Sequence, residues 1–323
     1  MKVKILPYLA FFLASLVFAY FSTGSTKEKQ SSAQEWMALP KGSIVQMSYE
    51  GDGKKTEITR EGEGENEVYW VEAISKAKTP EGEQEVKERF LANDKLKETT
   101  DALYSFQVEK IIGAAKDLKL EEFGLDKPTG HFLIKFSGDK TFKLALGKRG
   151  FQSPDVFALD EDKQIVLLVA KQIFASFERP KARLALTNPY RLNPDEVESA
   201  VLSVGDKHRE YVRQVKGQSK SWYVRDKLDT PDEAFRNWLD KFLKIKVEAY
   251  PDEAQKTVIA TLTPKFSILL KSQKAELDLL SVYEDVGSTP AKFWLKSKSL
   301  PVPVQVEGSK LSTLIADLAS LAL

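Results

Sequence analysis

The chain has 323 residues, enough for two domains of ordinary size, each with its own core. Its charges almost cancel, at 48 Lys and Arg against 47 Asp and Glu, so no long-range field attracts nucleic acid, and we expect no nucleic-acid partner. The absence of cysteine excludes disulfides, thiolate metal sites, cysteine nucleophiles and lipoprotein acylation.

The N-terminus predicts a membrane anchor. Lys2 and Lys4 precede a charge-free run at 5–21, which as a helix would measure about 25 Å, at the short end for a bilayer core of about 30 Å. A cleaved signal peptide is the alternative, with its candidate cleavage site at 22–24. We predict an uncleaved transmembrane signal anchor at 5–21, with residues 1–4 in the cytoplasm and the bulk of the chain exported.

A polar stretch follows the apolar run. Residues 22–40 are rich in Ser, Lys, Gln and Glu and show no hydrophobic periodicity until Trp36. This composition is typical of a flexible tether.

The next part of the chain predicts an α+β unit at 41–180. Three alternating runs within 44–73 indicate an antiparallel meander. Asn93 is placed to cap a helix, and a short helix is expected at 118–123. The buried stripe of the capped helix would contain Leu96, Thr100, Leu103 and Phe106. Two hairpins, turning at 138–139 and 160–162, and a final helix at 171–177 complete the unit.

The second half, 181–323, repeats this order. A meander at 200–226 is followed by a helix with Thr230 as the expected cap and by a hairpin at 265–280. The predicted buried stripe of that helix is Ala234, Phe235, Trp238, Leu239 and Phe242.

A constant offset favours a tandem duplication. The apolar pairs that share a separation of 137 residues are Phe157 with Trp294, Ile165 with Val302, Val169 with Val306, Phe174 with Leu311, and Phe177 with Leu314. The expected fold is therefore α+β: a duplicated unit with mostly antiparallel sheets, preceded by one transmembrane helix.

The stretch "LEEFGLDKP", 120–128, predicts a bend. Gly124 follows a short helix, where a left-handed residue satisfies the last carbonyl groups and Leu125 folds back onto the helix end. We expect Asp126 to accept a backbone N–H in the turn and Pro128 to hold Lys127 extended. No second titratable group is placed beside Asp126 by local spacing, so we favour a bend over a site.

Several motifs carry the resemblance to a known family. These are Phe123-Gly124-Leu125-Asp126-x-Pro128, the strand "FKLALGK" with Gly147, "DVFALD", "QIVLLV" and Trp222-x-Val224. Over roughly residues 40–260 the chain resembles the bacterial family of domain of unknown function 4340. The resemblance implies a membrane-anchored extracytoplasmic protein, often linked to ABC-type export or gliding-motility transporter components, and it supplies no catalytic residue.

Other candidate sites have simpler explanations. His131 and His208 lack a motif for metal binding or hydrolysis, and the acidic runs at 61–67 and 160–163 lack calcium-loop spacing and are expected to be solvated turns. Trp70 and Trp222, at equivalent positions of the two halves, are expected in the core rather than as an exposed glycan-binding pair. We therefore predict no catalytic, cofactor-binding or metal-binding residue, and no cofactor.

The predicted function is recognition rather than catalysis. We expect a non-enzymatic, membrane-tethered periplasmic interaction protein of the bacterial inner membrane, single-pass, with a protein partner in a transporter or envelope complex. The alternative is an envelope ligand-binding module for glycan or peptide.

Overall fold

The computed structural model describes residues 33–62, 64, 67–79, 82–138, 140–216 and 219–321. The predicted anchor at 5–21 and most of the predicted tether lie outside this range. No helix within the described ranges is long and apolar enough to cross a membrane.

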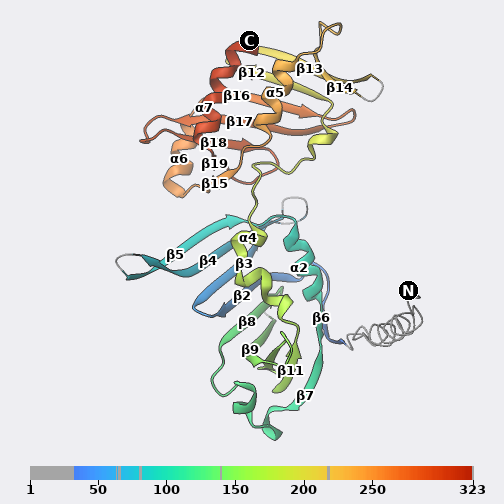
Figure 1. Cartoon of the computed structure of the whole chain (residues 1–323), viewed down its shortest axis with the longest axis vertical. Coiled ribbons are helices and arrows are strands. Elements are labelled where there is room, and N and C mark those ends of the chain that lie inside the picture. Colours follow the sequence, from blue (N-terminus) through green and yellow to red (C-terminus); the bar gives the residue numbers. More distant parts are fainter. Residues whose placement is uncertain are drawn as a thin grey trace, which may run out of the picture. The chain divides into compact units, whose positions relative to one another are not determined.

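The fold is α+β with antiparallel sheets, as predicted (Figure 1). A nine-stranded sheet has the order β5-β4-β3-β2-β8-β9-β10-β11-β7. Its strands are β2 (Ile44–Gly51), β3 (Lys54–Glu61), β4 (Val68–Thr79), β5 (Gly82–Leu91), β7 (Lys110–Ala114), β8 (Gly130–Phe136), β9 (Thr141–Arg149), β10 (Val156–Asp160) and β11 (Ile165–Val169).

The second large sheet has eight strands in the order β14-β13-β12-β16-β17-β18-β19-β15. Its strands are β12 (Ser199–Val204), β13 (Lys207–Lys216), β14 (Ser219–Val224), β15 (Val247–Ala249), β16 (Pro264–Lys271), β17 (Glu276–Asp285), β18 (Lys292–Ser297) and β19 (Val304–Val306).

The eight strands from β4 to β7 in the first sheet correspond in order to the eight strands from β14 to β15 in the second sheet. The strand β5 is the one described member of the nine-stranded sheet without a counterpart. Phe157 and Trp294 lie on the matched strands β10 and β18, and Val169 and Val306 end the matched strands β11 and β19.

Contact density divides the chain differently from the predicted boundary at 180/181. One compact unit contains the described residues up to Ser43 together with Thr99–Ala175, and the other contains Ile44–Glu98 together with the described residues from Ser176 onward. The first half of the chain therefore contributes to both units.

Helices and short turns of helix connect the strands. They are α2 (Lys95–Tyr104), η2 (Ala115–Asp117), η3 (Leu120–Phe123), η4 (Lys171–Phe174), α3 (Ala175–Glu178), α4 (Pro180–Leu184), η5 (Pro194–Glu196), α5 (Glu233–Phe242), α6 (Glu253–Thr261), α7 (Gly308–Asp317) and η6 (Leu318–Leu321).

The first predicted helix starts where its cap places it. The Asn93 side chain accepts the Lys95 N–H at 3.0 Å, at the start of α2. Leu96, Thr100 and Leu103 are buried as predicted. Phe106 is also buried, but it belongs to the strand β6 (Ser105–Val108), because the helix ends at Tyr104.

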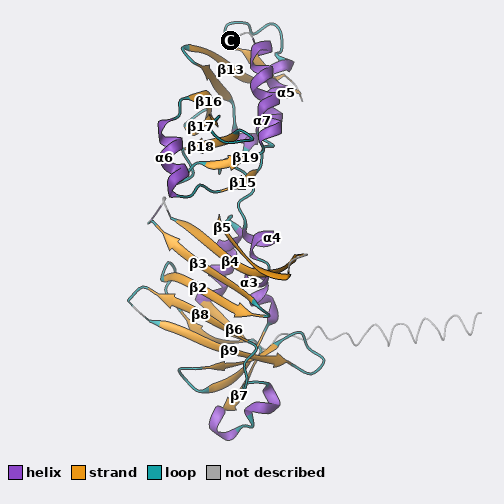
Figure 2. Ribbon diagram, turned by 90° about the vertical axis from the view of Figure 1, so that its left-hand side faces the viewer, coloured by secondary structure: helices purple, strands orange, loops and turns teal. Residues whose placement is uncertain are grey.

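The helix α5 begins later than predicted. Its cap is Asp232, which accepts the Phe235 N–H at 2.8 Å, and not Thr230. Figure 2 shows α5 and α7 side by side along the eight-stranded sheet, and the Trp238 indole donates to the Leu314 carbonyl of α7 at 2.9 Å. Phe235, Trp238, Leu239 and Phe242 form the buried stripe, whereas Ala234, in the first turn, is exposed.

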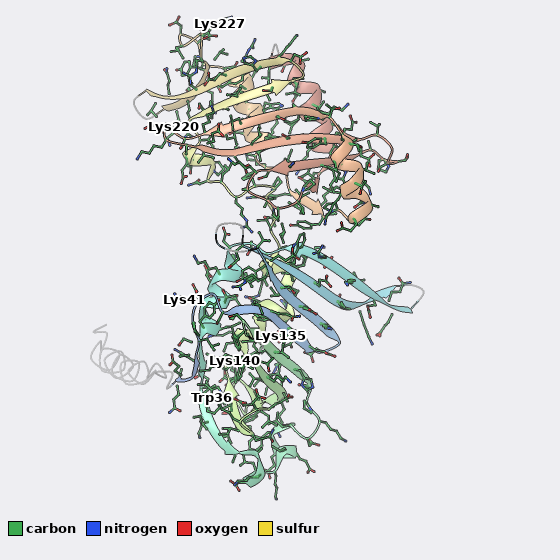
Figure 3. All side chains as sticks on the ribbon, turned by 180° about the vertical axis from the view of Figure 1, so that it is seen from behind. Trp36, Lys41, Lys135, Lys140, Lys220 and Lys227 are labelled. Atoms are coloured by element: carbon green, nitrogen blue, oxygen red, sulfur yellow. The ribbon has the colours of Figure 1, made fainter. Side chains whose placement is uncertain are left out.

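Part of the predicted tether is a strand. Residues Gln34–Ala38 form β1, which pairs antiparallel with β6 in a small separate sheet. Trp36, labelled in Figure 3, explains the difference, because its indole N–H donates to the Asp160 carboxylate at 2.9 Å and Lys163 lies 4.0 Å from its ring centroid.

Candidate functional site

The corner at Gly124 has the predicted backbone geometry. Gly124 is left-handed, with φ 66° and ψ 28°, at the end of η3. Its N–H bonds to the Glu121 carbonyl at 3.2 Å, and the Leu125 N–H bonds to the Leu120 carbonyl at 2.9 Å. These two bonds are the Schellman pattern that closes a helix C-terminus.

A second glycine of the same motif set meets this corner. A Cβ on Gly147 of β9 would lie 2.3 Å from the Phe123 carbonyl oxygen, and a Cβ on Gly124 would lie 3.1 Å from the Lys148 backbone nitrogen. Leu125, 4% exposed, packs in the same small core as Ala115 and Val166. The two glycine motifs are therefore parts of one close backbone contact.

Asp126 does not perform the predicted backbone role. Its side chain is exposed and accepts no hydrogen bond from any described residue, because the Schellman bonds already satisfy this turn. No described residue is placed to give Asp126 a catalytic or ligand-binding role, and the structure favours a bend here.

The acidic run at 160–163 is not uniformly solvated. Asp160 is 1% exposed, and its Oδ1 accepts the N–H groups of Asp162 at 3.1 Å and Lys163 at 2.9 Å. Its Oδ2 accepts the Trp36 indole N–H. The prediction of a solvated turn is wrong at this residue, because the carboxylate closes the β10–β11 turn from inside.

Both histidines lie on strands, with their side chains exposed. The Nδ1 of His131 is 3.4 Å from a Glu161 carboxylate oxygen, and both side chains are partly exposed. His208 is the exposed second residue of β13, after the turn formed by Gly205 and Asp206. Among the described residues, no group of three or more His, Asp or Glu is placed to hold a metal ion.

Both predicted core tryptophans are buried, Trp70 at 5% exposure and Trp222 at 7%. The Trp222 ring meets Phe235 edge-on at 5.3 Å between centroids. An exposed aromatic pair for a glycan is therefore not formed by these two residues.

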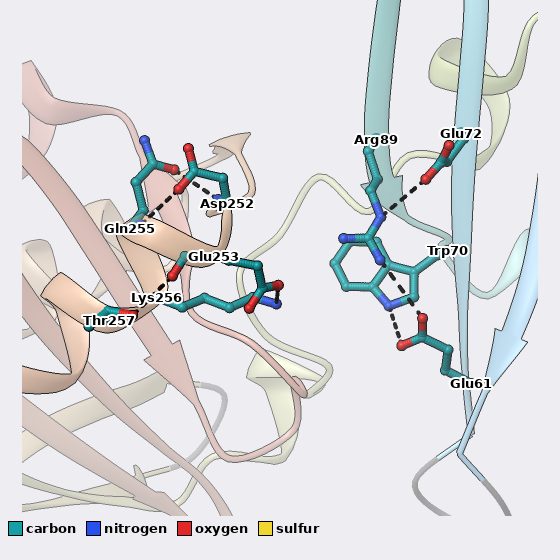
Figure 4. Close-up of polar contacts among 9 residues, drawn as sticks. All are labelled: Glu61, Trp70, Glu72, Arg89, Asp252, Glu253, Gln255, Lys256 and Thr257. Atoms are coloured by element: carbon teal, nitrogen blue, oxygen red, sulfur yellow. Dashed lines mark hydrogen bonds and ion pairs between the residues drawn. The ribbon is translucent and has the colours of Figure 1, made fainter.

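The contacts of Trp70 lie beside β5, the terminal strand of the nine-stranded sheet (Figure 4). Arg89 of β5 lies 3.9 Å from the Trp70 ring centroid, and the Trp70 indole donates to Glu61 at 2.9 Å. Glu72 of β4 pairs with both Lys87, at 3.0 Å, and Arg89, at 3.6 Å. These contacts fix the inner end of the β4–β5 hairpin.

The strand β5 is the terminal strand of its sheet and was not predicted as a strand. Its register with β4 runs without a bulge from Thr79 opposite Gly82 to Trp70 opposite Leu91. Residues 82–87 are all exposed. The hydrophilic stretch that ends β4 and begins β5 thus belongs to a long hairpin whose outer edge is open.

The start of α6, drawn in the same view, has its polar groups engaged with one another. There Asp252 accepts the Gln255 N–H at 2.7 Å and the Gln255 side chain accepts the Asp252 N–H at 3.0 Å (Figure 4). These groups form a helix-capping box, so their role is to close the helix end rather than to bind a ligand.

Two open cavities are lined by residues that form no recognisable catalytic or ligand-binding arrangement. One, of 490 Å³, is lined by Lys116, Leu120 and Lys163, together with two alanines and Gln164. The other, of 520 Å³, is lined by charges of both signs and by Tyr250, whose pKa is raised to about 12 by burial. A phenol with that pKa stays protonated at neutral pH. The β5 edge is the stronger candidate.

Comparison with known proteins identifies a family and no relative. A family model described as a domain of unknown function (DUF4340) matches residues 91–264, more than half of the chain. The match includes the contact between Gly124 and Gly147 and begins at the last residue of β5. No curated protein and no solved structure matches this chain.

Proposed function

The chain belongs to the family of domain of unknown function 4340, and from that premise we propose that it is a non-enzymatic, membrane-tethered interaction protein. Its bulk would lie in the periplasm, held to the inner membrane by residues 5–21. The proposed role is that of an accessory subunit of an ABC-type export or gliding-motility complex.

The observation that carries the proposal is the open edge of β5. An edge strand presents unpaired N–H and C=O groups, and an extended segment of a partner can bind by adding one more strand. The cation–π contact of Arg89 with Trp70 and the ion pairs to Glu72 hold this edge on the sheet.

The glycine motifs at 124 and 147 also favour recognition over catalysis. Gly124 and Gly147 serve a backbone contact, and Asp126 is an exposed carboxylate with no hydrogen-bond donor among the described residues. The alternative of glycan binding loses its aromatic pair, because Trp70 and Trp222 are buried. We therefore favour a protein partner.

The duplication belongs to the same proposal. The matching strand orders and the separation of 137 residues between Phe157 and Trp294 support two copies of one ancestral unit, at 41–180 and 181–323. Because β5 lacks a counterpart among the described strands, the second copy does not offer this edge, and a partner would have one such binding edge per chain.

Site-specific photocross-linking in the native host tests the function. A photoreactive residue at Glu85 should form an adduct with an envelope membrane protein, and one at Lys207, exposed on the interior strand β13, should not. Equal adducts from both positions, or none from position 85, would argue against the proposal.

A further inference from the structure

The outer edge of β5 has a defined set of free backbone groups. The Ala92 N–H bonds to the Tyr69 carbonyl at 2.8 Å, so 69 and 92 are a hydrogen-bonded pair. Because such pairs alternate along an antiparallel ladder, the even-numbered residues of β5 bond to β4 and the odd-numbered residues point their N–H and C=O away from it.

The open stretch of this edge runs from Glu83 to Arg89. At its end the Leu91 carbonyl accepts the Leu186 N–H at 2.8 Å, so the edge is covered there. The outward-pointing backbone groups of the open stretch belong to Glu83, Glu85, Lys87 and Arg89. All four side chains share one face of the strand, because side chains alternate between faces.

The charge pattern of these four residues is complementary to itself when two copies of the strand pair antiparallel. When the segment is placed against a second copy with Val86 opposite Val86, Glu83 lies opposite Arg89 of the other copy and Glu85 lies opposite Lys87. We propose that the β5 edges of two copies of this chain pair in this register, about a twofold axis at Val86, and join the two sheets.

The backbone allows this register. Each opposed pair on the charged face joins two outward-pointing residues, so each pair exchanges two N–H···O=C bonds. Val86, which is 37% exposed, meets its own copy on the other face. Lys87 and Arg89 each form an ion pair with Glu72 and remain partly exposed, so each cation can contact Glu72 and the facing glutamate of the other copy together.

Neighbouring registers are penalised. A slip of two residues in one direction places Glu85 opposite Glu85, and a slip in the other direction places Lys87 opposite Lys87. Like charges directly opposite each other destabilise a strand pair. Charges on an edge strand ordinarily disfavour pairing with any other strand. This charge pattern disfavours other strands and other registers but favours the register centred on Val86.

The proposal deepens the function proposed above, because it names a second copy as the partner at the same edge, and it rests on that edge being an interaction surface. Exposed ion pairs are weak and screened by salt, so the association should be weak in solution and weaker at high ionic strength.

Charge exchange on the full chain tests the pairing by sedimentation velocity. Glu85→Lys sets two lysines opposite each other at both symmetry-related places, and Lys87→Glu sets two glutamates there. Each single variant should therefore dimerise at least about tenfold more weakly than the parent. A mixture of the two variants, and the double variant alone, should regain the parent affinity. A monomeric parent, or a mixture that stays monomeric, would overturn the proposal.

Cross-linking gives an independent readout, because the chain has no cysteine. A cysteine in place of Val86 would sit in a non-hydrogen-bonded pair with Cα atoms about 4.5 Å apart, within reach of a disulfide. Oxidised Val86→Cys should form a covalent dimer, whereas Val215→Cys, 64% exposed on the interior strand β13, should not. Equal dimer from both would contradict the register.

One more variant separates this proposal from the function on which it rests. Lys87→Pro removes an outward N–H and leaves the bonds to β4 intact. If the parent is monomeric but Lys87→Pro abolishes the photoadduct of position 85 with another envelope protein, self-pairing fails and the interaction function stands. If Lys87→Pro changes neither the dimer affinity nor the yield of the photoadduct, both the self-pairing and the interaction function at this edge are refuted.

Discussion

At the scale of single residues, alanine substitutions at three glycines distinguish the cost of backbone strain from the cost of steric contact. Gly138 is left-handed with open space around it, Gly147 has an ordinary φ but faces the Phe123 carbonyl, and Gly124 combines both conditions. We expect Gly138→Ala to lower the free energy of unfolding by about 1 kcal/mol. Gly147→Ala should cost about 1–3 kcal/mol through overpacking, and Gly124→Ala should cost more than Gly138→Ala.

Chemical denaturation of the three variants measures these costs. Asp126→Asn is the matched control and should stay within about 0.5 kcal/mol of the parent, since the side chain is exposed. If Asp126→Asn abolished the photoadduct in a fully folded protein, the bend would be the wrong interpretation of this corner.

Tyr49 makes stability sensitive to alkaline pH. Burial, together with the carboxylates of Glu178 and Asp52, raises the pKa of Tyr49 from 10.0 to about 12. Between these values the unfolded chain loses the phenol proton and the folded chain keeps it, so this contribution to stability is constant below pH 10 and falls as pH rises toward 12. Tyr49→Phe should reduce the loss between about pH 9 and about pH 11 by about 1 kcal/mol. An unchanged loss would show that Tyr49 ionises normally.

At the scale of elements, β1 depends on a carboxylate far along the chain. Asp160→Ala removes the acceptor for Trp36 and for two backbone N–H groups of the β10–β11 turn. We expect about 2 kcal/mol lower stability. Amide exchange at 34–38 should also accelerate. A matched change at Asp162, in the same turn, should leave exchange in β1 unaltered.

Alternating apolar residues predicted β2 to β4, β8 to β11, β12 to β14 and the β16–β17 hairpin, because each has one face in a core. They could not predict β5, whose residues 82–87 are all exposed and whose strand state comes from pairing with β4. Asp160 could not be recognised as buried, since Trp36 is 124 residues away in sequence. The cap of α5 was misplaced because Thr230 and Asp232 are both suitable cap residues and the sequence does not choose between them.

At the scale of the whole molecule, the anchor remains a prediction with a direct measurement. A reporter fused after residue 323 should be active on the exported side, and the native protein should sediment with membranes, because Lys2 and Lys4 favour retention inside. Alkaline carbonate extraction should not release it. A mature N-terminus near residue 25 would instead establish cleavage.

The docking of β1 has a consequence for how the protein meets others. If residues 5–21 are anchored, only residues 22–33 separate the bilayer from a strand that is fixed to the folded body. About twelve residues span at most about 40 Å even when fully extended. Each copy would therefore diffuse in a shallow layer above the lipid, where encounters are two-dimensional and local concentration is high. An edge contact that populates only a fraction of dimer in dilute solution would then be largely occupied at the membrane.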